Sequence, residues 1–407
     1  MKILYLTQIL SPSIGGGELV FFNLAKGMLK LGHRVHIICH KKRNINSNSI
    51  EAPNFGIQEI ERMGGIIHYV KPEEKNDGKT SSSRTIFAAF NFHIGYIINA
   101  LRVANDLYRQ GEIDIIHANM YTPVIPASLF GRLRRIPVVM TLHNPTIDTW
   151  KQWSLQKGVP KSSAFLGPLY EKMLLRLPVT VVHVVSRKVR DELRLINPNA
   201  KAVLIYNGIE IEEDFDTQSE IQYNKYVLYM GRLVAGKNLQ TVILAFKKVN
   251  QLMPDAKLIV AGDGPLRQQW QELVDSNDLR NNIFFLGHVS NRKNKYELLT
   301  KTSAVVFPST SEGFAMVPIE AFQMSKPLLI SKIRPSDEIV DDNVDGFLLP
   351  PNDPDKWADK ILFLLNNPKI CKEMGSKGRL KVSETFNMTA VSNNMERLYE
   401  TLISKGA

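Results

Sequence analysis

Short apolar segments alternate with helical segments along most of the chain, and this alternation limits the fold more than any other feature. Residues 2–10 form an apolar segment, residues 11–17 a loop rich in glycine and serine, residues 18–31 an amphipathic helical pattern, and residues 35–39 a second apolar segment. Strands joined through a helix run parallel, because the crossover returns the chain to the edge where the first strand began. The sequence therefore predicts a β-α-β unit and an α/β fold.

The same pattern continues in two series of predicted strands. The first series is 66–70, 113–117, 138–142 and 179–185, and the second is 226–230, 257–261, 283–286, 304–307 and 328–331. A chain of 407 residues exceeds what one hydrophobic core usually supports. Between the two series, Pro198 and its asparagine neighbours break a helical pattern. We therefore expect two doubly wound, Rossmann-like domains, formed by residues 1–198 and 199–388.

Charge is distributed unevenly between the two halves of the chain. The formal net charge is +11, with +12 in residues 1–200 and −1 in residues 201–407. A basic first half indicates either an anionic partner, such as lipid phosphate at a membrane surface, or a solvated basic face. Basic residues are not interleaved with aromatic residues in a recognisable nucleic-acid module, so no nucleic-acid partner is expected.

The cysteines and the apolar segments indicate the compartment. Cys39 and Cys371 lack the paired spacing of a disulfide framework or of a cysteine-rich metal site. No segment of about eighteen uncharged apolar residues predicts a membrane-spanning helix. We therefore expect a cytoplasmic protein, with peripheral attachment to the cytoplasmic face of a membrane as an extension of the charge argument.

Two glutamates, Glu312 and Glu320, are placed around the start of a predicted helix. The helical pattern of residues 317–324 follows the predicted strand 304–307, and seven residues separate the glutamates. Backbone N–H groups at a helix N-terminus carry partial positive charge and suit an anion such as a diphosphate. Carboxylates accept hydrogen bonds from vicinal hydroxyls of a sugar or a ribose. The loop is therefore a candidate site for a nucleotide-bound sugar.

Two cations, Arg232 and Lys237, follow the predicted strand 226–230. A nucleoside diphosphate gains negative charge as its bond to a sugar breaks, so fixed cations beside it stabilise the transition state more than the ground state. The alternative is a solvent-exposed pair at the end of a strand.

The segment around Glu312 and Glu320 resembles the E-x7-E signature of retaining GT-B glycosyltransferases of family 4. Ala315 departs from the glycine that this family usually has there. Further motifs match in the expected order along nearly the whole chain: Gly15 to Glu18, Thr141 to His143, Asn207 with Gly208, Gly231 to Leu233 with Lys237, Gly262 to Pro265, and Leu286 to His288.

This resemblance implies a fold and a reaction. The fold would be GT-B, with two Rossmann-like domains facing across a cleft and a C-terminal helix, residues 389–407, packing back on the N-terminal domain. The reaction would be transfer of a hexosyl-type unit from a UDP- or GDP-linked sugar to a glycan, glycolipid or lipid-linked acceptor. The anomeric configuration would be retained. The nucleotide sugar would be a co-substrate, and neither a cofactor nor a metal ion would be required.

The resemblance also implies roles for individual residues. Glu320 would bind the ribose hydroxyls, Glu312 would bind a hydroxyl of the transferred sugar, and His143 would face that sugar. The expected catalytic residues are Glu312, His143, Arg232 and Lys237. The expected donor-binding residues are Gly15, Gly16, Gly17, Arg232, Lys237, Gly262, Asp263, Gly264, His288, Glu312, Gly313, Phe314, Ala315 and Glu320. His117 and Asn119 would line the acceptor side, with plain packing as the alternative.

Other functions remain open at this stage. A nucleotide-sugar epimerase of the same fold would convert the donor without an acceptor, and a non-catalytic nucleotide-sugar binding protein would not need both the glutamates and the cations. A polar, serine-rich loop is expected at residues 71–84. The helical pattern of residues 85–108 has an apolar side that would either rest on a bilayer or pack in the core.

Overall fold

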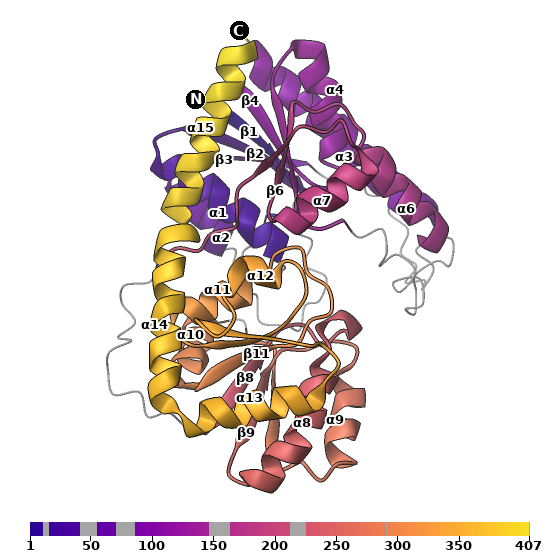
Figure 1. The fold of residues 1–407 in the computed structure, drawn as a ribbon. Coiled ribbons are helices and arrows are strands. Elements are labelled where there is room, and N and C mark those ends of the chain that lie inside the picture. Colours follow the sequence, from indigo (N-terminus) through magenta and orange to yellow (C-terminus); the bar gives the residue numbers. More distant parts are fainter. Residues whose placement is uncertain are drawn as a thin grey trace. The chain divides into compact units, whose positions relative to one another are not determined.

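The computed structural model comprises two compact units, and each is described by itself (Figure 1). The first unit is Met1–Tyr206 with Val391–Ala407, and the second is Asn207–Ala390. The structure describes residues 1–10, 16–40, 55–70, 86–145, 163–211, 225–289 and 291–406. The predicted loop at 71–84 and the predicted donor-binding residue Gly15 lie outside these residues.

The first unit contains a seven-stranded sheet in the order β3-β2-β1-β4-β5-β6-β7, with every neighbouring pair parallel. Its strands are β1 (Lys2–Leu6), β2 (Arg34–His40), β3 (Ile66–Val70), β4 (Ile115–Asn119), β5 (Val138–Leu142), β6 (Val181–Val184) and β7 (Ala202–Leu204). The central strands β4 and β5 are buried along their whole length. Such strands are apolar on both faces because helices cover both sides of the sheet.

The helices of the first unit connect these strands (Figure 1). They are α1 (Gly16–Lys30), α2 (Phe55–Arg62), α3 (Ile86–Arg109), α4 (Val124–Arg134), α6 (Ser163–Leu174) and α7 (Arg187–Ile196). The predicted helices at 18–31 and 85–108 are thus present, as α1 and α3. Among the residues that the structure describes, no helix is long and apolar enough to cross a membrane.

The second unit contains a six-stranded parallel sheet in the order β10-β9-β8-β11-β12-β13. Its strands are β8 (Tyr226–Met230), β9 (Lys257–Ala261), β10 (Ile283–Gly287), β11 (Ala304–Phe307), β12 (Leu328–Ser331) and β13 (Gly346–Leu349). Its helices are η2 (Ala235–Lys237), α8 (Leu239–Leu252), α9 (Arg267–Asp275), α10 (Arg292–Lys301), α11 (Met316–Gln323), α12 (Ser336–Ile339), α13 (Pro354–Asn366) and α14 (Pro368–Thr385). The core includes Phe246 and Trp357, both fully buried, and the indole nitrogen of Trp357 donates to the carbonyl of Pro350 over 2.9 Å.

The predicted fold class is confirmed, since both units are doubly wound parallel sheets with covering helices. The predicted boundary at 198/199 is wrong, because β7 pairs with β6 and completes the first sheet. The division between the compact units lies between Tyr206 and Asn207. Sequence reasoning placed residues 202–204 in the second domain because the strand is short and follows the helix break, and it also did not predict β13.

The last helix, α15 (Met388–Gly406), continues from the second unit into the first, and its residues from Val391 onward belong to the first unit. In the first unit, His33 Nε2 lies 2.7 Å from a carboxylate oxygen of Glu396. The hydroxyl of Tyr399 lies 3.0 Å from the hydroxyl of Tyr5, and both side chains are fully buried. These contacts attach the end of the chain to β1 and to the loop before β2.

Candidate active site

In the second unit, the predicted cations lie in the loop that leaves the carboxyl end of β8. Arg232 is exposed, and no ion pair joins it to another described residue. Lys237 ends the short helix η2, and its ammonium group forms an ion pair with the carboxylate of Glu312. The same ammonium lies 4.9 Å from the ring centroid of Phe307, the last residue of β11. The structure therefore brings two sequence motifs together at the carboxyl ends of neighbouring strands.

Backbone hydrogen bonds hold the two loops against each other. The backbone N–H of Thr310 donates to the carbonyl of Gly236 over 2.9 Å, and the Thr310 hydroxyl donates to the same carbonyl over 3.3 Å. Because these bonds fix the main chain, the pairing of Lys237 with Glu312 is a consequence of loop geometry and not only of charge.

The α11 helix begins directly after this loop. Ala315 occupies its N-cap position in an extended conformation and provides no side-chain hydrogen bond to the first turn. Gly313 and Ala315 are buried, and the ring of Phe314 packs against the ring of Phe386 with a centroid distance of 5.7 Å. The first N–H groups of α11 consequently have no side-chain acceptor from the N-cap, which is the arrangement that favours an anion.

Two glycines at the carboxyl end of β9 allow the neighbouring backbone to approach closely. A Cβ atom on Gly262 would lie 1.8 Å from the carbonyl oxygen of Gly231, and one on Gly264 would lie 2.5 Å from that of Leu233. Gly262 also has a φ of 157°, which side chains rarely adopt. These glycines place the β9 loop directly against the loop that carries Arg232.

Asp263 and His288 extend this edge of the sheet toward β10. A carboxylate oxygen of Asp263 lies 3.0 Å from Arg267 Nη1, and the other accepts a 2.7 Å hydrogen bond from the Gly264 backbone. These two contacts and the nearby positive groups keep the pKa of the Asp263 carboxyl below its usual range, and the Gly264 hydrogen bond is the largest cause. His288 is exposed just after β10. Apart from Glu320, which lies on α11, the predicted donor-site residues of the second unit thus lie at the carboxyl ends of β8 to β11.

Glu320 is buried on α11, with its side chain 6% exposed. One carboxylate oxygen, Oε1, lies 2.5 Å from Nζ of Lys295 on α10. The other, Oε2, is buried and has no hydrogen-bond partner among the described residues. Sequence reasoning missed Lys295, because 25 residues separate it from Glu320 and no pattern marks a lysine in the middle of a polar helix. The buried hydroxyl of Ser309, also unpartnered in the described part of the chain, was missed although Ser309 lies only three residues before Glu312.

In the first unit, a pocket of about 170 Å³ lies at the carboxyl ends of β1, β4 and β5. It is lined by Thr7, Gln8, Ile9, Gly17, Glu18, Asn119, Met120, Tyr121, His143 and Asn144. The absence of a side chain at Gly17 leaves space for the imidazole ring of His143, since a Cβ atom on residue 17 would lie 3.0 Å from Cδ2 of that ring. The predicted residues Gly17, Asn119 and His143 therefore share one cavity. Gly16 is the first residue of α1.

His143 is held in one protonation state and one orientation. Its Nε2 lies 2.9 Å from Oδ1 of Asn119. Desolvation, and to a smaller degree the positive charge that His183 can carry, lowers the pKa of His143 to about 3. The ring is thus neutral at physiological pH, Nε2–H donates to the Asn119 oxygen, and Nδ1 is left as the hydrogen-bond acceptor.

His117 does not line this pocket, and its burial favours packing, the alternative to an acceptor-binding role. It is fully buried, and both ring nitrogens are hydrogen-bonded within the first unit. Nε2 lies 2.6 Å from the Thr141 hydroxyl, and Nδ1 contacts the Tyr399 hydroxyl. Burial together with the nearby histidines holds the pKa of His117 well below its ordinary value. The strand pattern placed His117 at a sheet edge, but α15 covers it.

These contacts belong to a buried series of hydrogen bonds that ends at the carbonyl of Ile205, and this carbonyl fixes the direction of every bond in the series. The carbonyl of Ile205 can only accept, so Nε2 of His183 donates to it over 2.9 Å. Nδ1 of the neutral His183 then accepts from Thr141, whose oxygen accepts from His117 Nε2–H. His117 Nδ1 in turn accepts from Tyr399. The network therefore stabilises neutral histidines and joins β4, β5, β6 and α15.

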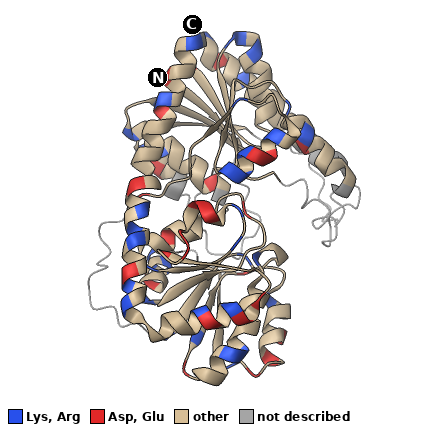
Figure 2. Ribbon diagram, viewed as in Figure 1, with Lys and Arg blue, Asp and Glu red and all other residues tan. Residues whose placement is uncertain are grey.

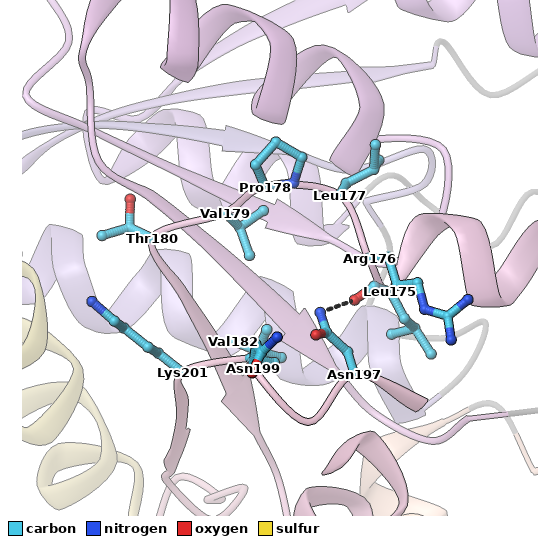
Figure 3. Close-up of a pocket in the computed structure, with 11 residues that line it drawn as sticks. Leu175, Arg176, Leu177, Pro178, Val179, Thr180, Val182, Asn197, Asn199 and Lys201 are labelled. Carbon is cyan, nitrogen blue, oxygen red and sulfur yellow. Dashed lines mark hydrogen bonds between the residues drawn. The ribbon is translucent and has the colours of Figure 1, made fainter. Parts of the chain in front are cut away.

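A second depression, of about 310 Å³, lies at the amino ends of β6 and β7 (Figure 3). Asn197 Nδ2 donates to the carbonyl of Leu175 over 2.9 Å at its edge, and Arg176 and Lys201 also line it. None of the predicted site residues lies here. The described ranges also contain no group of three or more His, Cys, Asp or Glu side chains that could hold a metal ion.

Comparison with known proteins matches both units to families. Residues 14–213 match the family described as Glycosyltransferase Family 4, and residues 210–381 match the family described as Glycosyl transferases group 1. An uncharacterized glycosyltransferase of Methanocaldococcus jannaschii is 28% identical over 407 residues, covering 99% of each chain. The N-acetyl-alpha-D-glucosaminyl L-malate synthase of Bacillus anthracis is 24% identical and covers 95% of this chain and 94% of its own.

Solved structures support the fold. The crystal structure of Anabaena HepE in complex with UDP-glucose superposes with a TM-score of 0.73 at 19% sequence identity, covering 98% of this chain and 100% of HepE. Since the two family matches are consecutive and together extend from residue 14 to residue 381, the chain belongs to the group 1 glycosyltransferases and has the GT-B fold.

Proposed function

We propose that this glycosyltransferase transfers a hexosyl-type unit from a UDP- or GDP-linked sugar to a hydroxyl of a glycan, glycolipid or lipid-linked acceptor. The observation that carries the proposal is the convergence, in the second unit, of Lys237 on Glu312 beside the uncapped start of α11. This places positive charge, hydrogen-bond acceptors and a helix N-terminus within one loop cluster. Those are the three features that a sugar diphosphate needs.

The diphosphate binds at the N-terminus of α11, with Arg232 and Lys237 as its cations. Arg232 is exposed and has no ion pair among the described residues, so its charge is available to a ligand. In the unliganded protein Glu312 compensates the charge of Lys237. Donor binding replaces that contact, since the diphosphate attracts the ammonium while a sugar hydroxyl donates to the carboxylate. These side chains supply the positive charge at the leaving group, and no metal ion is required.

Ribose recognition is assigned to Glu320, whose buried Oε2 lacks a donor within the described residues. A buried carboxylate oxygen without a donor is unfavourable by about 1–3 kcal/mol or more. A hydroxyl of the nucleotide removes that penalty on binding.

The pocket around His143 in the first unit receives a hydroxylated group. With a pKa of about 3, His143 cannot deliver a proton at neutral pH, so it serves as a hydrogen-bond acceptor through Nδ1. Asn119 fixes the ring for that purpose. Acceptor binding belongs to this unit.

The configuration at the anomeric carbon is retained. The bond from the anomeric carbon to the phosphate oxygen breaks, the acceptor oxygen bonds to the same face of that carbon, and the acceptor proton passes to the departing phosphate. No side chain need act as the base. NMR of the product from an α-linked donor tests this step: an α-linked product agrees with it, and a β-linked product contradicts it.

The decisive experiment is a panel of UDP-, GDP- and ADP-sugars tested for thermal stabilisation and for hydrolysis. HepE was solved with UDP-glucose, so UDP-glucose is the first donor to try. We expect one donor to raise the melting temperature and to release its nucleoside diphosphate. Binding of a donor without turnover, even with added acceptors, would indicate a non-catalytic binding protein. Conversion of the sugar in the absence of an acceptor would indicate an epimerase.

A partner surface is proposed on α6, in the first unit. Phe165 is 77% exposed and Leu169 60%, Lys172 is exposed in the last turn of the helix, and Arg176 is exposed just after its end. Together they form an apolar and basic surface that suits an anionic bilayer. In the predicted helix α3, Ile98 is exposed by 45%, but Tyr96, Ala100 and Leu107 are buried, so much of that helix packs in the core.

The basic end of α4 adds to this argument. It carries Arg132, Arg134 and Arg135, one of the basic segments drawn in blue in Figure 2. Flotation with liposomes containing anionic lipid should carry the cytoplasmic enzyme upward, and neutral liposomes should not. Equal behaviour with both kinds of liposome would contradict the proposal. A Phe165→Ser, Leu169→Ser variant should lose flotation, and Leu252→Ser, on the exposed side of α8, is the matched control.

A further inference from the structure

Lys295 and Tyr296, adjacent on α10, each contact one residue of α11 in the second unit. Lys295 Nζ lies 2.5 Å from Glu320 Oε1, and the Tyr296 hydroxyl donates to Gln323 Oε1 over 3.3 Å. Glu320 and Gln323 are one turn apart on α11, so both contacts fall on the same face of that helix. Gln323 is itself anchored, since its Nε2 donates to the carbonyl of Glu210 over 2.8 Å. The two helices are therefore fixed in register at this point.

The start of α10 is also fixed. The Asn291 side chain caps the helix and accepts from the backbone N–H of Lys293 over 2.8 Å. Lys295 therefore extends from a capped first turn, and its side chain is 24% exposed against 6% for Glu320. The carboxylate is the buried partner, and the ammonium reaches it from the more accessible side.

The two oxygens of Glu320 consequently differ in what they can accept. Oε1 is engaged by a charge-assisted hydrogen bond, and its direction sets the rotation of the carboxylate. Oε2 is buried and has no donor among the described residues. A carboxylate held in this way presents one oxygen, in one orientation, to an incoming hydroxyl.

We infer that Lys295 is a positioning residue that orients Glu320 so that Oε2 reads one hydroxyl of the nucleotide ribose. This inference rests on the proposed function. It goes beyond it by assigning selectivity for ribonucleotides over deoxyribonucleotides to a pair of side chains, and not to the glutamate alone. Without Lys295 the carboxylate turns, Oε1 competes for the same hydroxyl, and the ligand hydroxyl loses its fixed acceptor.

The test compares ribose with deoxyribose in the same binding experiment. UDP, GDP and ADP are titrated into the full-length protein by calorimetry, and the tightest is carried forward with its 2′-deoxy and 3′-deoxy forms. We expect one of the deoxy forms to bind the wild-type protein about 10- to 100-fold more weakly, the range for one hydrogen bond to a charged group. The ratio of the Kd of that deoxy form to the Kd of the ribonucleotide measures the selectivity. In Lys295→Met this ratio should fall to about threefold or less, while the deoxy form keeps nearly its wild-type affinity.

Matched variants separate positioning from general damage. Lys301→Met removes a lysine from the same helix, where it pairs with exposed Glu297, and should keep the full ratio. Lys295→Arg should restore most of the ratio, because the guanidinium keeps a donor near Oε1. If burial of Glu320 without its cation impairs folding, the double variant Lys295→Met, Glu320→Gln removes both charges. Its ratio should equal that of either single variant, since the two residues act as a unit.

The outcomes distinguish this inference from the proposed function. Full ribose selectivity in Lys295→Met, or equal binding of ribo and deoxy forms to the wild type, would overturn the role of Lys295 and leave the transferase proposal standing. Absence of binding by any nucleoside diphosphate to the wild type would overturn both. In turnover assays, Lys295→Met should raise the donor KM with little change in kcat, whereas loss of kcat alone would contradict a role in donor positioning.

Discussion

His143 donates the hydrogen on its Nε2 to the side-chain oxygen of Asn119, and these two atoms lie 2.9 Å apart. Asn119 ends β4 and His143 follows β5, its neighbour in the first sheet. The contact fixes which ring nitrogen remains free for a ligand. It also explains why these two residues, identified separately in the sequence, belong to one site.

His143→Ala should lower kcat/KM by about 10²-fold, because a preorganised polar group at a reacting sugar is lost. Asn119→Ala should lower it by about tenfold, since the ring keeps its place but loses its fixed tautomer. Steady-state kinetics with the donor identified in the panel measure both. Asn105→Ala is the control, as its side chain binds Arg134 away from the pocket, and it should leave kcat/KM unchanged. Equal activity of all three variants would remove His143 from the site.

Arg232→Ala and Lys237→Ala should each reduce turnover by about 10²–10³-fold, because each removes a fixed charge at the leaving diphosphate. Melting temperatures should stay within a few degrees of the wild type. Lys248→Ala is the matched control, since that lysine pairs with Asp359 on the surface of the same unit. Near-normal turnover in both site variants would exclude a diphosphate clamp here.

Gly262→Ala should destabilise the second unit by more than about 2 kcal/mol, because the new Cβ meets backbone and the φ angle is strained. The contact is 1.8 Å to the Gly231 carbonyl. Gly236→Ala is the matched control in the adjacent loop, where nothing lies within 4 Å of a new Cβ. Its stability should change by about 0.5 kcal/mol or less. Urea unfolding measures the difference, and equal effects would contradict the close approach.

Tyr399→Phe should destabilise the first unit more than Tyr5→Phe. Tyr399 donates to His117 and accepts from Tyr5, so its removal leaves two buried groups unpaired, at about 1–3 kcal/mol for each. Removing the Tyr5 hydroxyl leaves only an acceptor position on Tyr399 unfilled. Chemical unfolding of both variants checks the order, and the reverse order would contradict the bridging position of the Tyr399 hydroxyl between His117 and Tyr5.

Acidification should loosen the first unit before the second. Burial lowers the pKa of His183 to about 4 and that of His143 to about 3, and also lowers that of His117. The ordinary pKa of histidine is 6.5, so below pH 6.5 these histidines bind protons in the unfolded chain but remain neutral in the folded protein. The folded state therefore loses stability as the pH falls from 6.5 toward 4. Between pH 7.5 and 5.5 each of these three histidines should lower the free energy of unfolding of the first unit by about 1.4 kcal/mol.

Hydrogen exchange at the two pH values measures this loss in each unit. His288 is the one histidine of the sequence within the second unit, so that unit serves as the internal control. Equal acid sensitivity of the two units would contradict the assignment.

Part of this protein could be predicted from local sequence alone. Most strands of both sheets, from Ile66–Val70 to Leu328–Ser331, appear where apolar segments are bounded by turn residues. The spacing of Glu312 and Glu320 and the glycines near Gly262 also mark the donor-site loops, because the chemistry there depends on neighbours in the chain. A short strand such as β7 carries too few residues to show which sheet it joins, and so the boundary was misplaced.

The sequence by itself determined two α/β units and the loops that bear charge and glycine at strand ends. Only the tertiary structure decided that Lys295 holds Glu320, that Asn119 orients His143 and that His117 is covered by Tyr399. These pairs join residues far apart in the chain. Their contacts depend on strand order and on how each helix is rotated against its neighbour, and those are set by packing of the whole unit and not by any local pattern.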